Sequence, residues 1–212
     1  MSRERIFLFF TFFLFGYHGI TQQNDTASGQ IRFFNKTEAG VAFGIGSFKT
    51  DIYNGVQRKA KNDEIVVSLQ TVNGVRYNNR WALGLSLGVE KWREGLFWPV
   101  YGYLGYNFKR TENTFYANVY LGYGIGTRYA TTYYEKGKGA FSMIIGIGYR
   151  MKIAKNLRFG YEIFYKYQAL KSTYYNIYQN SSDTTTTKNS KTPVDYQFGL
   201  HFAGFRILVD FP

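Results

Sequence analysis

The side chains best suited to catalysis or metal binding are scarce in this sequence. The chain of 212 residues has no cysteine and two histidines, His18 and His201. His201 stands in the stretch LHFAGF, which offers no nearby serine for a catalytic triad. The carboxylates are scattered, so no clustered set of metal ligands is evident. We therefore predict no catalytic residue, no metal site and no cofactor, and we expect that the protein is not an enzyme.

Charged residues that alternate with apolar ones form the remaining candidate site. In the stretch LRFGYEIFYKYQ (157–168), Arg158, Glu162 and Lys166 fall on one face of a strand. Because an isolated buried charge is costly, charges enclosed by protein should form ion pairs. Such a group could be a filled polar core, which we favour, or a gated path for ions. The predicted network consists of Glu90, Arg150, Arg158, Glu162, Lys166, Arg206 and Asp210.

Strands must position these charges, because apolar residues recur at every second position. In FYANVYLGYGIG (115–126), the odd positions are apolar or aromatic and the even positions are polar residues or glycine. A period of two is typical of a strand with one apolar face. The same alternation predicts strands near residues 39–48, 64–77, 80–90, 97–108, 115–126, 141–151, 157–168 and 205–211.

The charges also decide which face of the strands lies inside. They share a face with glycine, serine and other small residues, whereas the opposite face is a coat of Leu, Ile, Val, Phe and Tyr. A soluble monomer does not expose an apolar coat of that extent. A barrel in a membrane accommodates both faces, with the coat against lipid and the charges in the lumen. We therefore predict an all-β protein, a closed antiparallel up-and-down transmembrane β-barrel of about eight strands.

The first residues have the layout of a cleaved signal peptide. Arg3 and Arg5 precede a short apolar run, residues 6–15, and small and polar residues follow it. The run is too short to span a membrane as a helix. We predict a signal peptide at 1–21, a periplasmic N-terminal lead at 22–36 and an outer-membrane barrel at 37–212.

The connections between the predicted strands alternate in length. Links at 78–79, 109–113 and 152–156 are short, as periplasmic turns are, and links at 49–63, 127–139 and 171–193 are long, as external loops are. The link at 93–95 is a short exception. The net charge is +12, but export argues against nucleic acid as a partner. Basic loop residues could instead contact lipopolysaccharide phosphates, or they could simply be solvated: Lys59, Lys61, Lys136 and Lys138.

The stretch QTVNGVRYNNRWALGLSLGVEKWREGLFWPVYGYLGYNF (70–108) carries a family resemblance. Its Asn-Gly-containing hairpin, G-x-G strand and proline-led return strand resemble the small outer-membrane β-barrel proteins of Bacteroidetes-type bacteria. More distantly, the chain resembles the OmpA transmembrane domain and OmpX. The resemblance implies an eight-stranded fold, an outer-membrane location, and recognition of the last strand by the barrel-assembly machinery. The final aromatic, Phe211, is followed by Pro212, which departs from the usual end of that signal.

We expect an integral outer-membrane protein with a structural and surface-presenting role. Its partners would be outer-membrane lipid, lipopolysaccharide, and an extracellular ligand at the loops. A small porin-like channel for ions or small solutes is the alternative. A lipid A-modifying enzyme is a weaker alternative. Barrel enzymes of that kind pair a histidine with a nearby serine, and the stretch around His201 has no serine.

Overall fold

The structure, a computed structural model, describes residues 31–52, 56–93, 95–111, 113–127, 136–177 and 191–211. The predicted signal peptide at 1–21 lies outside these residues. Eight strands form the main sheet: β1 (Ile31–Ile45), β4 (Ile65–Tyr77), β5 (Trp81–Lys91), β6 (Leu96–Asn107), β7 (Thr114–Thr127), β8 (Lys136–Ala154), β9 (Leu157–Ile177) and β10 (Lys191–Phe211). Two short strands, β2 (Ser47–Ile52) and β3 (Val56–Lys61), form a separate hairpin. Within the described residues, no helix is long and apolar enough to cross a membrane.

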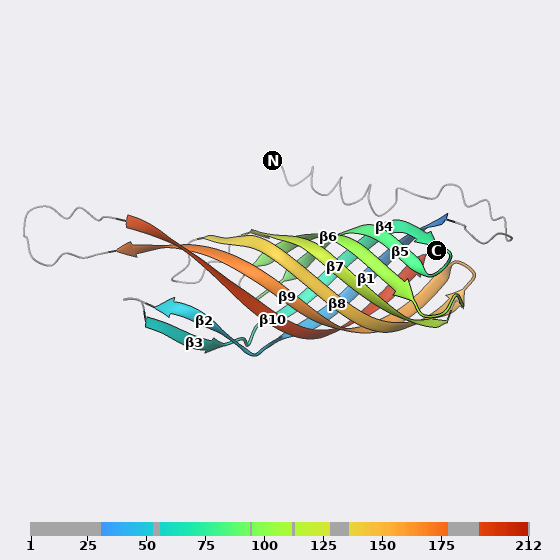
Figure 1. Cartoon of the computed structure of the whole chain (residues 1–212), viewed down its shortest axis with the longest axis horizontal. Coiled ribbons are helices and arrows are strands. Elements are labelled where there is room, and N and C mark those ends of the chain that lie inside the picture. Colours follow the sequence, from blue (N-terminus) through green and yellow to red (C-terminus); the bar gives the residue numbers. More distant parts are fainter. Residues whose placement is uncertain are drawn as a thin grey trace, which may run out of the picture.

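The eight strands close into an antiparallel barrel in the order β1-β10-β9-β8-β7-β6-β5-β4 (Figure 1). Closure comes from β1, which pairs with β4 on one side and with β10 on the other. The Cα register places Glu38 opposite Gln70 of β4 and opposite Leu208 of β10. Every main strand therefore has two neighbours, and the barrel has no open edge. The predicted fold class, a closed antiparallel barrel of eight strands, is confirmed.

Side chains alternate between the two faces of the wall along most of each strand. On β5, Leu83 and Leu85 are 56% and 68% exposed, whereas Ser86 is completely buried. On β7, Phe115 is 60% exposed and Tyr120 is completely buried. The outward residues form an apolar belt around the barrel, which suits a hydrocarbon environment and not water. The belt includes Phe43, Val67, Leu69, Leu83, Leu85, Leu121, Ile125, Ile145, Ile147, Ile163, Phe205 and Ile207.

Several strands are longer than their sequence pattern predicts. Residues 31–36 were predicted to be part of a periplasmic lead, but they begin β1, with Phe33 facing outward and Phe34 inward. The alternation was masked there because the inward residues Lys36 and Glu38 are charged. The predicted loop at 49–63 contains most of the β2–β3 hairpin, and β8, β9 and β10 extend into the two other predicted loops.

Two backbone features end the strands abruptly. Asn78 and Asn79 have φ of 54° and 55°, the left-handed pair at the centre of a tight turn between β4 and β5 in which the Arg80 N–H donates to the carbonyl of Tyr77 at 3.0 Å. Gly46 has φ of 74° at the point where the chain leaves β1 for the β2–β3 hairpin. Asn62 holds the segment that leads from β3 back to the barrel. Its backbone N–H donates to the carbonyl of Gly46 at 3.1 Å, and its side-chain amide donates to the carbonyl of His201 at 2.7 Å.

Candidate functional site

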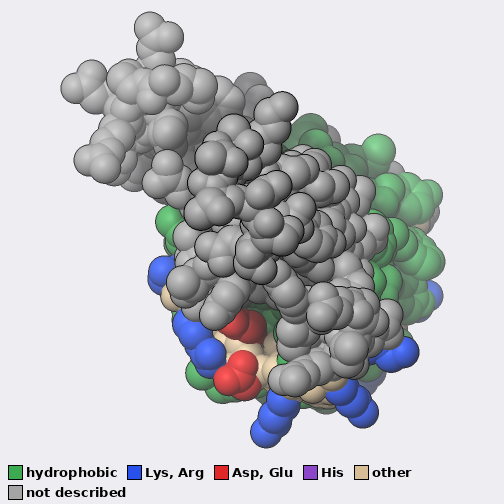
Figure 2. All heavy atoms as spheres, turned by 90° about the vertical axis from the view of Figure 1, so that its left-hand side faces the viewer, with side chains coloured by type: hydrophobic (Ala, Val, Ile, Leu, Met, Phe, Trp, Pro, Cys, Tyr) green, Lys and Arg blue, Asp and Glu red, His purple; other side chains and the backbone are tan. Residues whose placement is uncertain are grey.

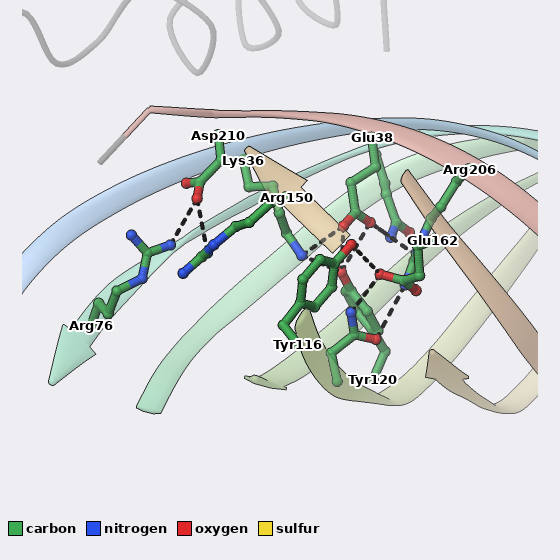
Figure 3. A network of polar contacts seen from close by, with 11 residues as sticks. Lys36, Glu38, Arg76, Tyr116, Tyr120, Arg150, Glu162, Arg206 and Asp210 are labelled. Carbon is green, nitrogen blue, oxygen red and sulfur yellow. Dashed lines mark hydrogen bonds and ion pairs between the residues drawn. The ribbon is translucent and has the colours of Figure 1, made fainter. Parts of the chain in front are cut away.

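The centre of the barrel holds two carboxylates and two cations in contact (Figure 3). Lys36 Nζ lies 2.6 Å from Glu38 Oε1, and Arg206 Nη1 lies 2.9 Å from Glu38 Oε2. Arg206 also donates from Nε to Glu162 Oε1 at 2.8 Å. Arg206 therefore bridges the two carboxylates, and the charges in this central cluster balance.

Neutral side chains complete the hydrogen bonds of the two carboxylates. Tyr120 donates its hydroxyl to Glu38 at 2.8 Å and accepts a hydrogen bond from Lys36 at 2.9 Å. Tyr116 and Asn118 donate to Glu162 Oε2 at 2.9 and 2.6 Å. A buried ion pair is tolerated only when its remaining donors and acceptors are satisfied, and these groups meet that condition.

Inward glycines make room for this cluster. A β-carbon built at Gly146 would overlap the carboxylate of Glu162 and crowd the side-chain oxygen of Asn118. Outward-facing Gly102 has open space instead, with its nearest neighbour, the carbonyl oxygen of Leu121, at 3.7 Å. Glycines on the inner face thus leave space for larger polar side chains nearby.

A second cluster closes the end of the barrel farther from the C-terminal residues. Lys166 of β9 is ion-paired with Glu90 of β5, and both are buried. Trp92, from the turn after β5, donates its indole N–H to Glu90 at 3.2 Å. Its ring packs against Phe97 and Phe202, with centroid separations of 4.8 and 5.1 Å. An aromatic cap therefore covers this ion pair.

A third cluster lies near the opposite end, around Asp210. Its Oδ2 is 2.9 Å from Arg76 Nη2, 3.1 Å from Arg150 Nη1 and 3.8 Å from Arg158 Nη1. The carboxylate is completely buried, and the three arginines are 3 to 6% exposed. One carboxylate oxygen thus faces three guanidinium groups.

All seven charges predicted from the sequence lie buried inside the barrel, divided among these three clusters. The sequence prediction lacked Lys36, Glu38 and Arg76 as network members. Lys36 and Glu38 were missed because the first strand was expected to start at Ala39. Arg76 was missed because nothing in the sequence pairs it with Asp210, which is 134 residues away.

Of the four lysines predicted to contact lipopolysaccharide, two have side chains that the structure describes. Lys59 and Lys61 are exposed on β3. Lys136 and Lys138 lie in β8, but their side chains are outside the part that the structure describes. His201 is half-buried and its Nδ1 contacts the Tyr165 hydroxyl. Among the described residues, no group of three or more His, Asp or Glu side chains is arranged to hold a metal ion.

The fold, the apolar belt and the charged interior define a β-barrel of the membrane-spanning kind, with its polar side chains inside. No family model and no curated protein matches the chain. Among solved structures, it shares its fold with the outer membrane protein AlkL, determined by solid-state NMR in DMPC bilayers. The identity is 12% and the TM-score 0.51, over 92% of this chain and 96% of AlkL. Neisserial surface protein A matches at 13% identity and a TM-score of 0.43, over 84% of this chain and 97% of that protein.

Proposed function

We propose that the protein is an integral outer-membrane barrel with a structural and surface-presenting role, and that its lumen is filled. In this proposal the chain is exported by its N-terminal signal and inserted by the barrel-assembly machinery. It belongs with the small OmpA-like and OmpX-like barrels of Bacteroidetes-type bacteria that its sequence resembles. The fold shared with the outer membrane protein AlkL supports the location. The filled interior is the observation that carries the proposal.

Two contacts reach across the full width of the barrel. The β5–β9 contact between Glu90 and Lys166 joins strands four places apart in the eight-stranded ring. The β1–β7 contact between Lys36 and Tyr120 does the same. A side-chain contact between opposite walls narrows the lumen at that level. The interior is therefore better suited to stabilising the barrel than to conducting ions.

Purified, refolded protein should give no discrete current steps in a planar bilayer. The physical reason is that the cap at Trp92 and the central cluster both obstruct the lumen. Folding should be verified first by the gel shift between unboiled and boiled samples, and a porin of known conductance should be added last as a sensitivity control. Steps in the wild type that change on neutralising Glu90 and Glu162 would contradict the proposal and favour the small-channel alternative.

The β2–β3 hairpin supports a contact with lipopolysaccharide. Lys59 lies opposite Lys49 across the hairpin, and Lys61 lies opposite Ser47. Phe48 packs against the buried apolar cluster and fixes the hairpin to the barrel. Figure 2 looks onto this end and shows Lys and Arg side chains along the rim of the described surface. Anionic phosphates are the groups such a basic rim attracts.

Replacing Lys59 and Lys61 with glutamine should weaken lipopolysaccharide binding by about twofold to thirtyfold at low salt, because each of the two exposed ion pairs contributes roughly 0.2–1 kcal/mol. Binding can be measured by titrating detergent-solubilised protein with labelled lipopolysaccharide. The matched control replaces Lys152 and Lys155, which are exposed at the opposite end of the barrel. Equal losses in both double variants would mean that only net charge matters, and the hairpin contact would be rejected.

A further inference from the structure

We infer that the cluster formed by Arg76, Arg150, Arg158 and Asp210 is a binding site for a small protonated oxyanion of the hydrogenphosphate type. This inference goes beyond the proposed surface role and does not depend on it. It rests on the charge, burial and hydrogen bonding of this cluster, which differ from those of the two other clusters inside the barrel.

The charge of the cluster is not balanced by its own side chains. Among the described side chains, six cations and four carboxylates are buried, and the central and capping clusters account for three of each. Around Asp210, Arg76 and Arg150 face the same carboxylate, so its single negative charge does not balance both guanidinium groups. Phe34 stacks on Arg76, with the guanidinium carbon 4.9 Å from the ring centroid, and keeps water from that side. Buried like charges in this proximity call for a counter-anion.

The hydrogen bonding shows what chemistry that anion should have. The Nε atoms of Arg76 and Arg150 are buried, and neither has a hydrogen-bond partner among the described residues. These two arginines extend from β4 and β8, which are four places apart in the ring, and their guanidinium groups converge on Asp210 (Figure 3). An anion between opposite walls could accept hydrogen bonds from both.

Asp210 adds a requirement that a simple anion does not meet. Its Oδ1 is buried and has no hydrogen-bond partner among the described residues, while Oδ2 faces all three arginines. An ionised carboxylate can only accept hydrogen bonds, so a ligand beside it must donate one. Hydrogenphosphate has a P–OH donor as well as anionic oxygens, whereas sulfate at neutral pH has no donor. The same site should therefore prefer phosphate to sulfate.

The interior position favours a free anion over a lipid headgroup. Asp210 points into the lumen and is completely buried, whereas the outward neighbour Phe211 is 48% exposed on the wall that faces lipid. A site on the inner face of the wall does not meet the lipid that surrounds the barrel. A phosphate monoester on a lipid carries the same chemistry, so an experiment should separate the two sources.

The test is binding of inorganic phosphate and of sulfate to refolded protein in lipid-free non-ionic detergent at pH 7, with matched ionic strength. We expect saturable phosphate binding by isothermal titration calorimetry, a urea unfolding midpoint that rises with phosphate, and at least tenfold weaker binding of sulfate. Arg150→Gln should weaken phosphate binding at least tenfold. Lys152→Gln, which removes an exposed charge at the same end, should leave it unchanged. Asp210→Asn should abolish the preference for phosphate over sulfate.

Three outcomes would overturn the inference. Equal effects of phosphate and sulfate on the wild type would mean charge screening only, and this comparison needs no variant to fold. No binding of either anion would mean that the cluster is only hydrated. Binding to vesicles that contain phosphatidic acid, without binding of free phosphate, would assign the chemistry to a lipid headgroup at another place on the barrel.

Discussion

Replacing Arg206 with methionine is expected to lower the unfolding free energy of the barrel by about 3 to 5 kcal/mol, the usual cost of removing one partner from a buried ion pair. Arg206 is 3% exposed and contacts both Glu38 and Glu162. Without it, the hydrogen-bond partners that Glu162 keeps among the described residues are the neutral side chains of Tyr116 and Asn118. Urea unfolding from lipid vesicles, followed by tryptophan fluorescence, measures the change.

The double variant with Arg206→Met and Glu162→Gln is the matched control. It removes one cation and one anion together, and it leaves the Lys36–Glu38 pair in place. Replacing both members of a buried pair is much less costly than replacing one, so a large part of the lost stability should return. If the single variant unfolds within about 0.5 kcal/mol of the wild type, the central cluster does not stabilise the barrel as described.

Replacing Leu85 with arginine should cost about 2 to 4 kcal/mol in a bilayer, since that is the penalty for a lipid-facing arginine near the membrane midplane. Leu85 is 68% exposed and lies in the middle of β5. The same urea titration measures the effect.

Ile153→Arg supplies the depth control for Leu85→Arg. Ile153 is 60% exposed, but it lies next to the turn that joins β8 and β9. Near the interface the penalty falls to about 0 to 1 kcal/mol. A Leu85→Arg variant as stable as the wild type would mean that water, and not lipid, surrounds the belt.

The sequence predicted the eight-stranded barrel and its inner face because both depend on an alternation of period two. That alternation is clearest where small and large residues face opposite ways, as in β5 and β7. It failed at the start of β1, where the charged residues Lys36 and Glu38 looked like part of a polar lead. The β2–β3 hairpin was missed because its residues are mostly polar and lack an apolar face.

The partners within the candidate site were harder to predict than its members. Nothing in the local sequence shows that Trp92 turns inward from a short connection to cover the Glu90–Lys166 pair. Nor does it show that Arg76 and Arg150 meet at Asp210. These contacts depend on strand tilt and on the register of the whole barrel, which are set by all eight strands together.

The contacts across the lumen also bear on how the barrel forms. Glu90 and Lys166 are 76 residues apart, and Arg76 and Asp210 are 134 apart. Arg206 and Asp210 both lie on β10, which comes last in chain order among the described strands. A sheet that lacks β10 has unpaired edges and lacks Arg206 and Asp210, so neither the central cluster nor the cluster around Asp210 is complete. Folding should therefore be slow and all-or-none, with its main barrier at closure. The same barrier should also slow unfolding, so the folded barrel should be kinetically stable.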